Sequence, residues 1–559
     1  MANFLLTTAP PRIALSPRES GDGDRLARNG EGDWLAAAGT WFHADARDEA
    51  ALLALYARSG IDAIARGLEG FFVLVIFDAR AAEYSIVTDL MGSRHCFFRE
   101  LDGDLAVSTS SLRLAGLAPA ALDPTAVEEY LRTGVIYEER TLFREVRKLA
   151  PATIYRIVAG RIVERRPYWR FDDLETDAIE AAAAAERLAE ALVAAAARIG
   201  RAFLSPVCDL TGGWDSRAIV AAFLRAGAAF EATVSGPVDG ADVTIARRLA
   251  ARAGISLLHL EPEPQLRIDD AVRLTDGEAD PVEYARIAEI HRRTIGRFDV
   301  SINGSYGEIA RGYWWELLWP RAGERRPIDA RALAAKRYLT AAESPDLYPT
   351  GAGLDLVAHL AAILGRSATA ERNTAQMDQA YLFVRMQRWQ GRIASATDRI
   401  RPCLSPFMFR SVLEAALRTP PRLRRNNRLM RDVIHRLRPD LAAEPLESGA
   451  PALPLNWRTG PRFLPAAGVA AKKAWRRFAP PASAPPAPPA RLRLWRDERI
   501  AATLAPATML LGAVIDPARL QAFLAASRRA AFGFDAQWNR LLGLELALRS
   551  LAEKRGADL

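Results

Sequence analysis

The stretch Val207-Cys208-Asp209-Leu210-Thr211-Gly212-Gly213-Trp214-Asp215-Ser216-Arg217 predicts a buried strand, a tight glycine turn and the start of a helix. Residues 207–210 are mostly apolar, as in a strand that is buried on both faces of a sheet. Gly212 and Gly213 let the backbone turn sharply and let a ligand approach it closely. After Ser216, apolar residues recur at helical spacing, at positions 219, 220, 223 and 224.

The start of this helix offers a binding site for phosphate. The first N–H groups of a helix have no partner within it, and the helix dipole is positive there. Thr211 and Ser216 add hydroxyl donors, and Asp215 adds a carboxylate that could hold Mg²⁺ against phosphate oxygens. The stretch is neither a Walker A loop nor a dinucleotide-binding fingerprint, because it has neither glycine pattern. Taken alone, the same residues are equally typical of an ordinary turn between a strand and a helix.

Strands and helices alternate on both sides of this stretch. We expect strands at 230–235, 256–260 and 299–302, and helices at 177–199 and 242–253. This alternation predicts a parallel sheet with crossover helices, in which ligands bind at the carboxyl ends of the strands. Residues 211–216 would lie at that edge, and helical segments dominate from about 329 to 447.

The first 168 residues are rich in short apolar runs and predict a separate, strand-rich domain. The run at 71–77 is a candidate for a buried strand, and strands are also expected at 84–88 and 105–108. Between the latter two, Asp102-Gly103-Asp104 suits a hairpin turn. Helices are expected at 49–58 and 124–132.

The chain after residue 475 has a different composition. Residues 478–492 are rich in proline and predict an extended, semi-rigid linker between a domain at 175–475 and a helical segment at 493–559. Apolar residues at helical spacing predict helices at 517–528 and 536–551. We expect this segment to pack on the second domain or on a partner chain, and a homodimer is one option.

Composition excludes several classes of function. The net charge of +8 comes almost entirely from dispersed arginines, so nucleic-acid binding is not expected. The three cysteines form no CxxC pair, which fits a reducing compartment and argues against a zinc site. The N-terminus does not look like a signal peptide, and the longest apolar run is too short to span a bilayer. We therefore expect a cytoplasmic protein without a membrane partner.

With these landmarks in place, residues 45 to 450 resemble the glutamine-dependent asparagine synthetase family, which includes β-lactam synthetases and lasso-peptide cyclases. The loop at 211–216 is similar to the family's Ser-Gly-Gly-x-Asp-Ser loop, with Thr211 in place of the first serine. Other stretches match in the same order: Gly70–Asp78, Asp89–Arg94, Leu122–Pro124 with Thr141–Leu149, and Gly307-Glu308 with Arg311-Gly312-Tyr313.

For the first domain, the resemblance implies an α+β fold of the N-terminal-nucleophile type that hydrolyses glutamine. In the family, a cysteine directly after the initiator methionine is the nucleophile, but this chain has Ala2 there. The family's glutamine-binding Asn-Gly-Glu corresponds to Ala38-Gly39-Thr40. We therefore expect a degenerate class II glutamine-amidotransferase-like domain without glutaminase activity.

For the second domain, the resemblance implies an α/β ATP-pyrophosphatase fold, also called adenine nucleotide α-hydrolase-like. Such domains use ATP and Mg²⁺ to adenylate a carboxylate, release pyrophosphate and let an amine attack the acyl-adenylate. The implied contacts with pyrophosphate and Mg²⁺ are Thr211, Gly212, Gly213, Asp215 and Ser216. The implied contacts with the base and ribose are Leu210, Val234, Asn303 and Gly304.

The chain departs from the family at several of its charged positions. The family's second metal aspartate falls at Gly307, so Glu308 is the carboxylate that could share the metal with Asp215. The family's late lysine is absent, and Arg428 or Arg431 could contact pyrophosphate instead. Three further residues have two interpretations each. Arg217 is either a cation beside the phosphate loop or a salt-bridge partner on the helix. Glu278 and Asp280 either bind the amine or a metal ion, or lie in a solvated turn.

The sequence therefore predicts an AMP-forming amide ligase in which Asp215, Glu308 and Arg428 are catalytic. Its substrates would be ATP, an unidentified carboxylate and an amine or ammonia, without use of glutamine. The alternative is a non-catalytic relative that binds nucleotide or a protein partner. A sulfur-transferring or tRNA-modifying relative would need paired cysteines and a basic face, and neither is evident.

Overall fold

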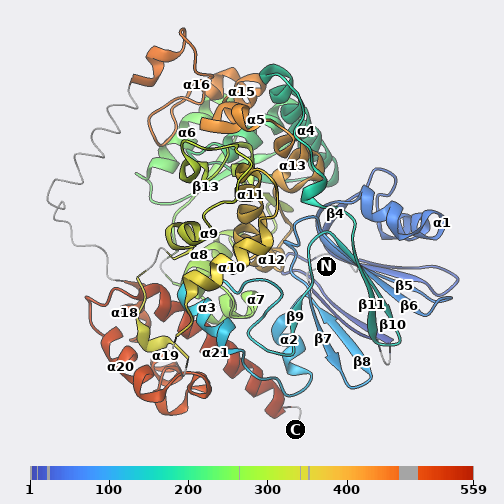
Figure 1. The fold of residues 1–559 in the computed structure, drawn as a ribbon, viewed down its shortest axis with the longest axis vertical. Helices are drawn as coiled ribbons and strands as arrows, with labels where there is room; N and C mark the ends of the chain where they lie inside the picture. Colours follow the sequence, from blue (N-terminus) through green and yellow to red (C-terminus); the bar gives the residue numbers. More distant parts are fainter. Residues whose placement is uncertain are drawn as a thin grey trace.

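The computed structural model describes residues 3–8, 11–21, 25–263, 265–339, 342–349, 353–464 and 489–557. In the first part of the chain, two antiparallel sheets lie face to face (Figure 1). One has the strand order β2-β1-β8-β7-β9, with β1 Asn3–Thr8, β2 Pro11–Ser16, β7 Phe97–Leu101, β8 Asp104–Ser108 and β9 Arg147–Lys148. The other has the order β11-β10-β6-β5-β4-β3, with β3 Leu26–Arg28, β4 Trp34–Phe42, β5 Glu69–Asp78, β6 Glu83–Thr88, β10 Thr153–Val158 and β11 Arg161–Pro167.

The buried strand predicted at 71–77 is confirmed as part of β5, and its surroundings explain its unbroken apolar run. On one face, Val73 and Val75 pack with the other sheet. On the opposite face, Phe72 and Leu74 pack against α1 (Glu49–Gly67). A strand covered on both faces carries apolar residues at every position.

Two local predictions in this part of the chain need correction. The turn at Asp102-Gly103 does form a hairpin, but it joins β7 to β8, while β6 belongs to the other sheet. The helix expected at 49–58 continues to Gly67 as α1, through a break at Gly60 where φ is 74°. The helix expected at 124–132 is confirmed as α3 (Pro124–Thr133), which begins after the capping residue Asp123.

The predicted parallel sheet is confirmed. Its five strands have the order β14-β13-β12-β15-β16 and all neighbours are parallel. They are β12 Pro206–Asp209, β13 Glu231–Ser235, β14 Leu257–Leu260, β15 Val300–Ile302 and β16 Cys403–Leu404. The crossover and flanking helices are α4 Ala181–Ala202, α5 Asp215–Ala226, α6 Ala241–Ala253, α7 Ile268–Thr275 and α8 Pro281–Arg292. The largest apolar core of the molecule lies around this sheet.

Residues 329 to 447 are mainly helical, as predicted. The α-helices of this region are α9 Ala330–Leu333, α10 Leu356–Ser367, α11 Asn373–Gln379, α12 Trp389–Asp398, α13 Arg410–Leu417, α14 Pro421–Arg424, α15 Arg428–Leu437 and α16 Pro439–Ala443. Between α11 and α12 the chain continues as a π-helical segment, Ala380–Met386.

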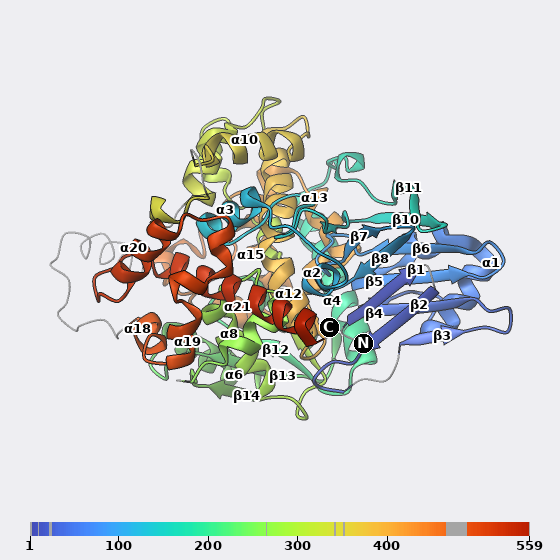
Figure 2. The same cartoon turned by 90° about the horizontal axis from the view of Figure 1, so that it is seen from below.

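The C-terminal segment forms α18 (Ala490–Leu494), α19 (Glu498–Thr503), α20 (Pro517–Ser527) and α21 (Asp535–Ala557), so both predicted helices are confirmed. Most of the proline-rich linker lies outside the described residues, and residues 490–492 are helical rather than extended. Helix α21 runs along the base of the molecule (Figures 1 and 2) and contacts α2 (Ser111–Gly116) and α3 as well as α7 and α8. The segment therefore packs on both preceding parts of its own chain.

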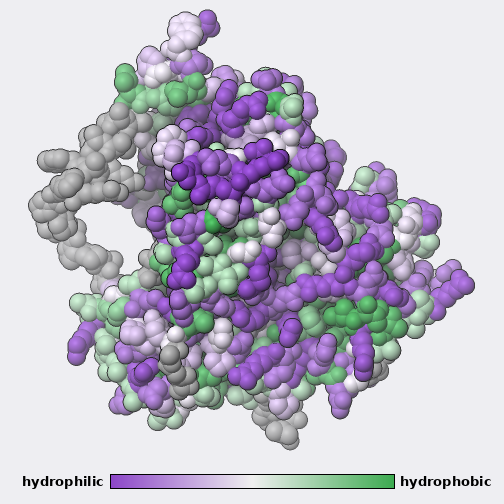
Figure 3. All heavy atoms as spheres, in the orientation of Figure 1, coloured by the Kyte–Doolittle hydropathy of each residue, from purple (hydrophilic) through white to green (hydrophobic). Residues whose placement is uncertain are grey.

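The surface is mostly hydrophilic on the face shown in Figure 3, with separate apolar areas. One of these areas lies over β10 and β11, where Val163 is half exposed. Among the described helices, none combines the length and the apolar character that a membrane crossing requires.

Candidate functional site

The loop between β12 and α5 is held by hydrogen bonds of its own hydroxyl groups. The backbone N–H of Thr211 donates to the Ser216 hydroxyl (3.1 Å), and the two hydroxyl oxygens lie 3.0 Å apart. The backbone N–H of Gly213 donates to the Thr211 hydroxyl (3.2 Å). The backbone N–H of Gly212 donates to the carboxylate of Asp242 at the start of α6 (2.8 Å), a residue that the sequence analysis missed. The loop is therefore shaped in advance, and Asp242 ties it to the neighbouring crossover helix.

The segment after β15 passes tightly over the start of α5. A Cβ atom at Gly304 would lie 2.9 Å from both Asp215 Cβ and the Ser216 nitrogen, and one at Gly307 would lie 2.5 Å from Asp215 Cγ. No side chain fits at either position without moving Asp215. The two glycines thus allow the close approach that places Asp215 and Glu308 on either side of one guanidinium group.

A guanidinium group, which the sequence analysis did not assign, stands between these two carboxylates. Arg311 donates to both carboxylate oxygens of Asp215, from Nε at 3.1 Å and from Nη2 at 2.6 Å. Its Nη2 also lies 3.7 Å from Glu308, whose other oxygen accepts a hydrogen bond from the Tyr381 hydroxyl. Burial acts to lower the pKa of Arg311, but the two carboxylates outweigh it and raise the pKa above its usual value. Arg311 is therefore charged.

The residues do not fit the predicted magnesium site as they are arranged. Carboxylates are the ligands that Mg²⁺ prefers, but those of Asp215 and Glu308 already bind Arg311 and Tyr381. Gly307 contributes no ligand. In the described parts of the chain, no group of three or more His, Cys, Asp or Glu side chains is arranged to hold a metal ion.

A cavity of about 310 Å³ lies at the carboxyl ends of the parallel strands. Three residues that the sequence assigned to the nucleotide line it: Thr211 and Asn303, which follow β12 and β15, and Val234, which is the penultimate residue of β13. Ligand pockets in proteins begin at about this volume. Leu210 is buried and Gly304 packs on Asp215, and neither of these two predicted contacts lines the cavity.

The cavity also contains polar groups that the sequence did not point to. Arg401 donates from Nε to His291 Nδ1 (3.3 Å), and its Nη1 is buried without a hydrogen-bond partner among the described residues. Asp209 accepts a hydrogen bond from the Thr233 hydroxyl (3.3 Å). Burial raises the pKa of Asp209 to about 6, while the charge of Arg401 acts in the opposite direction.

Asp209 makes the stability of the protein depend on pH. Because unfolded aspartates ionise near pH 4, the folded chain keeps the proton on Asp209 between about pH 4 and 6, and stability falls as the pH rises through that window. We expect wild type to lose about 2 kcal/mol of unfolding free energy across it, relative to Asp209→Asn. Urea unfolding of both proteins at a series of pH values measures this difference. A difference that stays constant with pH would contradict the prediction.

A second cavity of about 280 Å³ adjoins the first, because Glu283, Ile287, Trp389 and Ile393 line both. Arg385 and Arg540 line it as well, the latter from α21. Arg385 stacks on the ring of Trp389 (4.5 Å), and Arg540 donates to the Leu131 carbonyl (3.0 Å). The C-terminal segment therefore forms part of the wall of this cavity.

The three arginines considered as phosphate contacts have different surroundings. Arg431 stacks between the rings of Trp214 (4.7 Å) and Phe463 (5.0 Å) and donates to two backbone carbonyls. Arg428 lies exposed at the first position of α15. Arg217 is fully buried and donates to the carbonyls of Leu441, Glu444 and Pro445, so it is neither a phosphate contact nor a salt-bridge partner on the helix surface.

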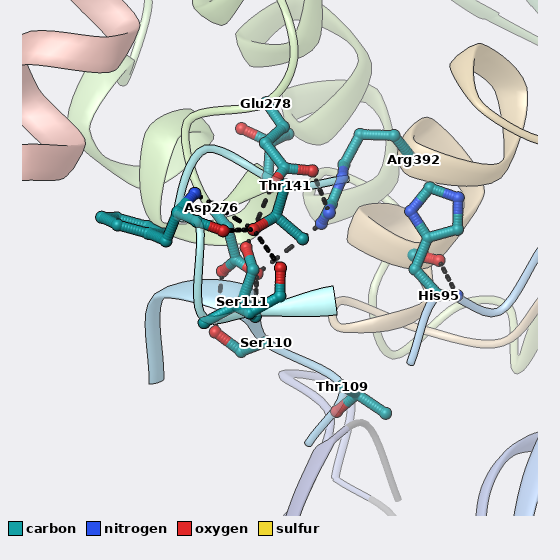
Figure 4. A network of polar contacts seen from close by, with 12 residues as sticks. His95, Thr109, Ser110, Ser111, Thr141, Asp276, Glu278 and Arg392 are labelled. Atoms are coloured by element: carbon teal, nitrogen blue, oxygen red, sulfur yellow. Dashed lines mark hydrogen bonds and ion pairs between the residues drawn. The ribbon is translucent and has the colours of Figure 1, made fainter. Parts of the chain in front are cut away.

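Glu278 and Asp280 do not lie in a solvated turn. Glu278 is buried, where it accepts hydrogen bonds from Arg392 (2.5 Å) and from the Ser111 hydroxyl (3.1 Å). Asp280 caps α8. Figure 4 shows Glu278 and Arg392 beside Asp276, Ser110 and Ser111 in one polar network. The network joins α2 of the first part of the chain to the turn after α7, so Glu278 has a structural partner instead of a free carboxylate.

Comparisons with known proteins bear on the first part of the chain. Residues 33–169 match the model of the glutamine amidotransferase domain, which relates this part to amidotransferases. No curated protein matches the chain. Two of the solved structures that match are a glutamine phosphoribosylpyrophosphate (PRPP) amidotransferase from B. subtilis complexed with ADP and GMP, and an allosteric regulatory enzyme of purine biosynthesis.

These structural matches are distant. The first is 14% identical to this chain, and the match covers 42% of this chain and 47% of the solved chain, with a TM-score of 0.18. The second is 13% identical, covers 44% of this chain and 58% of its own, and also has a TM-score of 0.18. This chain therefore spans about half the length of each.

Proposed function

We propose that this amidotransferase-related chain is an ATP-dependent carbon–nitrogen ligase that forms AMP and pyrophosphate. A carboxylate oxygen of the substrate attacks the α-phosphorus of ATP, and the bond from that phosphorus to pyrophosphate breaks. The nitrogen of an amine or of ammonia then attacks the acyl carbon, loses a proton and displaces AMP. The observation that carries the proposal is the pair of adjoining cavities. The first is lined by Thr211 and would take ATP, and the second would take the carboxylate and the amine.

The first cavity suits the nucleotide. Its position at the carboxyl ends of parallel strands is where such sheets bind ligands. The loop residues from Thr211 to Ser216 lead into α5, whose first N–H groups and dipole favour an anion. In this proposal the base and ribose lie along Val234 and Asn303, and pyrophosphate leaves past Gly212, Gly213 and Ser216.

The second cavity would take the carboxylate, with Glu278, Asp280 and Glu283 in its wall as acidic neighbours for the amine. Arg385 and Arg540 place two guanidinium groups in its wall, and guanidinium binds carboxylates through paired hydrogen bonds. Trp389 and Ile393, which line both cavities, would position the acid next to the α-phosphorus. Arg428 remains the proposed pyrophosphate contact, because its side chain is exposed while that of Arg431 is held by Trp214 and Phe463.

The first part of the chain would not supply ammonia from glutamine. Position 40, where the family has its glutamine-binding glutamate, carries Thr40, which has no charge. This substitution supports an amine or free ammonia as the nitrogen source.

One observation favours the alternative, a relative that binds nucleotide without turnover. Asp215, which would serve catalysis, is bound at both oxygens by Arg311. In that case the two cavities would serve recognition only, and ATP would bind without being cleaved.

The test is release of AMP and pyrophosphate from ATP in the presence of a panel of carboxylates with ammonia, amines or glutamine. We expect release with an amine or ammonia but not with glutamine, and at least a tenfold loss in Asp215→Asn, because Asp215 holds the Arg311 guanidinium group beside the start of α5, where it can stabilise the departing charge. The exposed residue Asp269 offers a matched control, Asp269→Asn, which should retain full activity. Equal release by wild type and Asp215→Asn would contradict the ligase, and ATP binding without AMP would favour the alternative.

A further inference from the structure

We propose that Arg311 occupies a latent divalent-cation site, so that its guanidinium group takes the place of a metal ion between Asp215 and Glu308 and excludes one. The inference concerns the protein without nucleotide. It holds or fails independently of the ligase activity proposed above.

The contacts of Arg311 use the carboxylates that a metal would need. Both oxygens of Asp215 accept hydrogen bonds from Arg311, at 3.1 and 2.6 Å. The same Nη2 atom lies 3.7 Å from Glu308, so one cation faces both acidic side chains. The Asp215 and Arg311 side chains are only 15% and 17% exposed, and little water separates the charges. A metal ion can bind here only if the guanidinium leaves.

The local backbone holds Arg311 in this position. Gly307–Ala310 forms a single 3₁₀ turn, and the N–H of Arg311 bonds to the Glu308 carbonyl (2.9 Å). The next residue, Gly312, has φ of 67°, and a Cβ atom there would lie 2.5 Å from the ring of Trp315. The turn therefore carries both Glu308 and Arg311, and its exit is fixed by packing against Trp315.

The neighbours on the far side of the two carboxylates, Gly307 and Tyr381, add no third acidic ligand. On its other side, Asp215 lies against Gly307, where any added side chain would collide with the carboxyl group. The second oxygen of Glu308 is bound by Tyr381, whose ring packs edge-on against Tyr313 and Trp314. Restoring an aspartate by Gly307→Asp would consequently displace Asp215 instead of completing a metal site.

Removal of the guanidinium should open the site. Arg311→Met keeps the length of the side chain without charge or donors, and leaves the Asp215 and Glu308 carboxylates facing each other. Two like charges in close contact repel, and a divalent cation relieves that repulsion. Arg311→Gln is a second neutral variant for the case that the methionine variant does not fold.

The experiment is titration of each protein with Mn²⁺, followed by electron paramagnetic resonance of the free ion. We expect no saturable binding at this site in wild type up to about 1 mM, the weak limit of oxygen-ligand sites. Arg311→Met or Arg311→Gln should bind Mn²⁺ at least tenfold more tightly, and Asp215→Asn in the same background should abolish the gain. Arg337→Met, which frees only the single carboxylate of Glu316, is the matched control and should gain nothing.

Two results would overturn the proposal. The first is binding of Mn²⁺ by wild type that Asp215→Asn removes, because the site would then take a metal despite Arg311. The second is that neither folded Arg311 variant gains binding, because the guanidinium would then not be what excludes the ion. The Mn²⁺ titration contains no nucleotide, so its outcome does not depend on whether the chain cleaves ATP.

Discussion

Replacing Asp276 by alanine is expected to lower the free energy of unfolding by about 3–5 kcal/mol, because it leaves the buried guanidinium group of Arg399 without its carboxylate. Asp276 accepts hydrogen bonds from both Nη atoms of Arg399 (3.0 and 3.2 Å) and lies 3.6 Å from Arg392. Its side chain is 2% exposed. Burial acts to raise the pKa of Asp276, but the two arginines outweigh burial and hold the pKa below its ordinary value.

The same carboxylate connects distant parts of the chain. It accepts the backbone N–H of Ser111 and the hydroxyl of Ser110 (both 3.0 Å), which begin α2. Its own backbone closes α7 in the left-handed region, with φ of 53°. Because asparagine adopts this conformation at lower cost than alanine, Asp276→Asn separates the loss of charge from backbone strain.

Chemical unfolding followed by circular dichroism measures the effect. Asp269→Ala is the matched control, because its carboxylate is 58% exposed and pairs with Arg499 at the surface. Such exposed pairs contribute about 0–1 kcal/mol. If Asp276→Ala is no less stable than this control, the buried network does not hold the two parts of the chain together.

Replacing Trp538 by alanine is expected to cost about 3–5 kcal/mol of stability, because the truncation opens a large cavity in a packed core. The side chain is fully buried, and its ring lies 5.7 Å from that of Trp495 in α18–α19. The same apolar cluster contains Leu131 of α3 and Ala285 of α8. The prediction follows from the position of α21 between the two preceding parts of the chain.

Two further variants make this prediction specific to the buried position. Trp457→Ala removes an indole that is 82% exposed and should change stability by less than about 0.5 kcal/mol. Trp538→Phe retains most of the volume and removes an N–H that has no hydrogen-bond partner among the described residues, so it should cost less than the alanine variant. Equal stability of Trp538→Ala and Trp457→Ala would mean that α21 is only loosely attached.

Much of the fold could be predicted because its signals are local. The alternation of apolar strands and amphipathic helices from 177 to 302 identified the parallel sheet, and the unbroken apolar run at 71–77 identified a strand covered on both faces. The hairpin at Asp102-Gly103 shows the limit of such signals. The turn was recognised, but which strands it joins depends on sheet membership, and β6 and β8 lie in different sheets.

The residues of the candidate site also fall into two groups, those that the sequence could predict and those that it could not. Thr211, Val234 and Asn303 could be grouped in advance, because the carboxyl ends of neighbouring parallel strands meet at one edge. Asp242, Arg401 and Arg311 could not, because no spacing pattern links them to the loop. Arg311 stands 96 residues after Asp215, and only the close passage of Gly304 and Gly307 brings the two together.

The sequence by itself determined four strands of the parallel sheet, the buried strand at 71–77 and the place of the glycine turn, since each is encoded in the spacing of neighbouring residues. It did not identify β16 or most strands of the two antiparallel sheets. Only the tertiary structure decided which charges meet. It gave Asp215 a guanidinium partner, placed Glu278 in a buried network and set α21 between two parts of the chain. The physical reason is that ion pairing and burial depend on distance in space, which residues far apart in the chain acquire only when the elements pack.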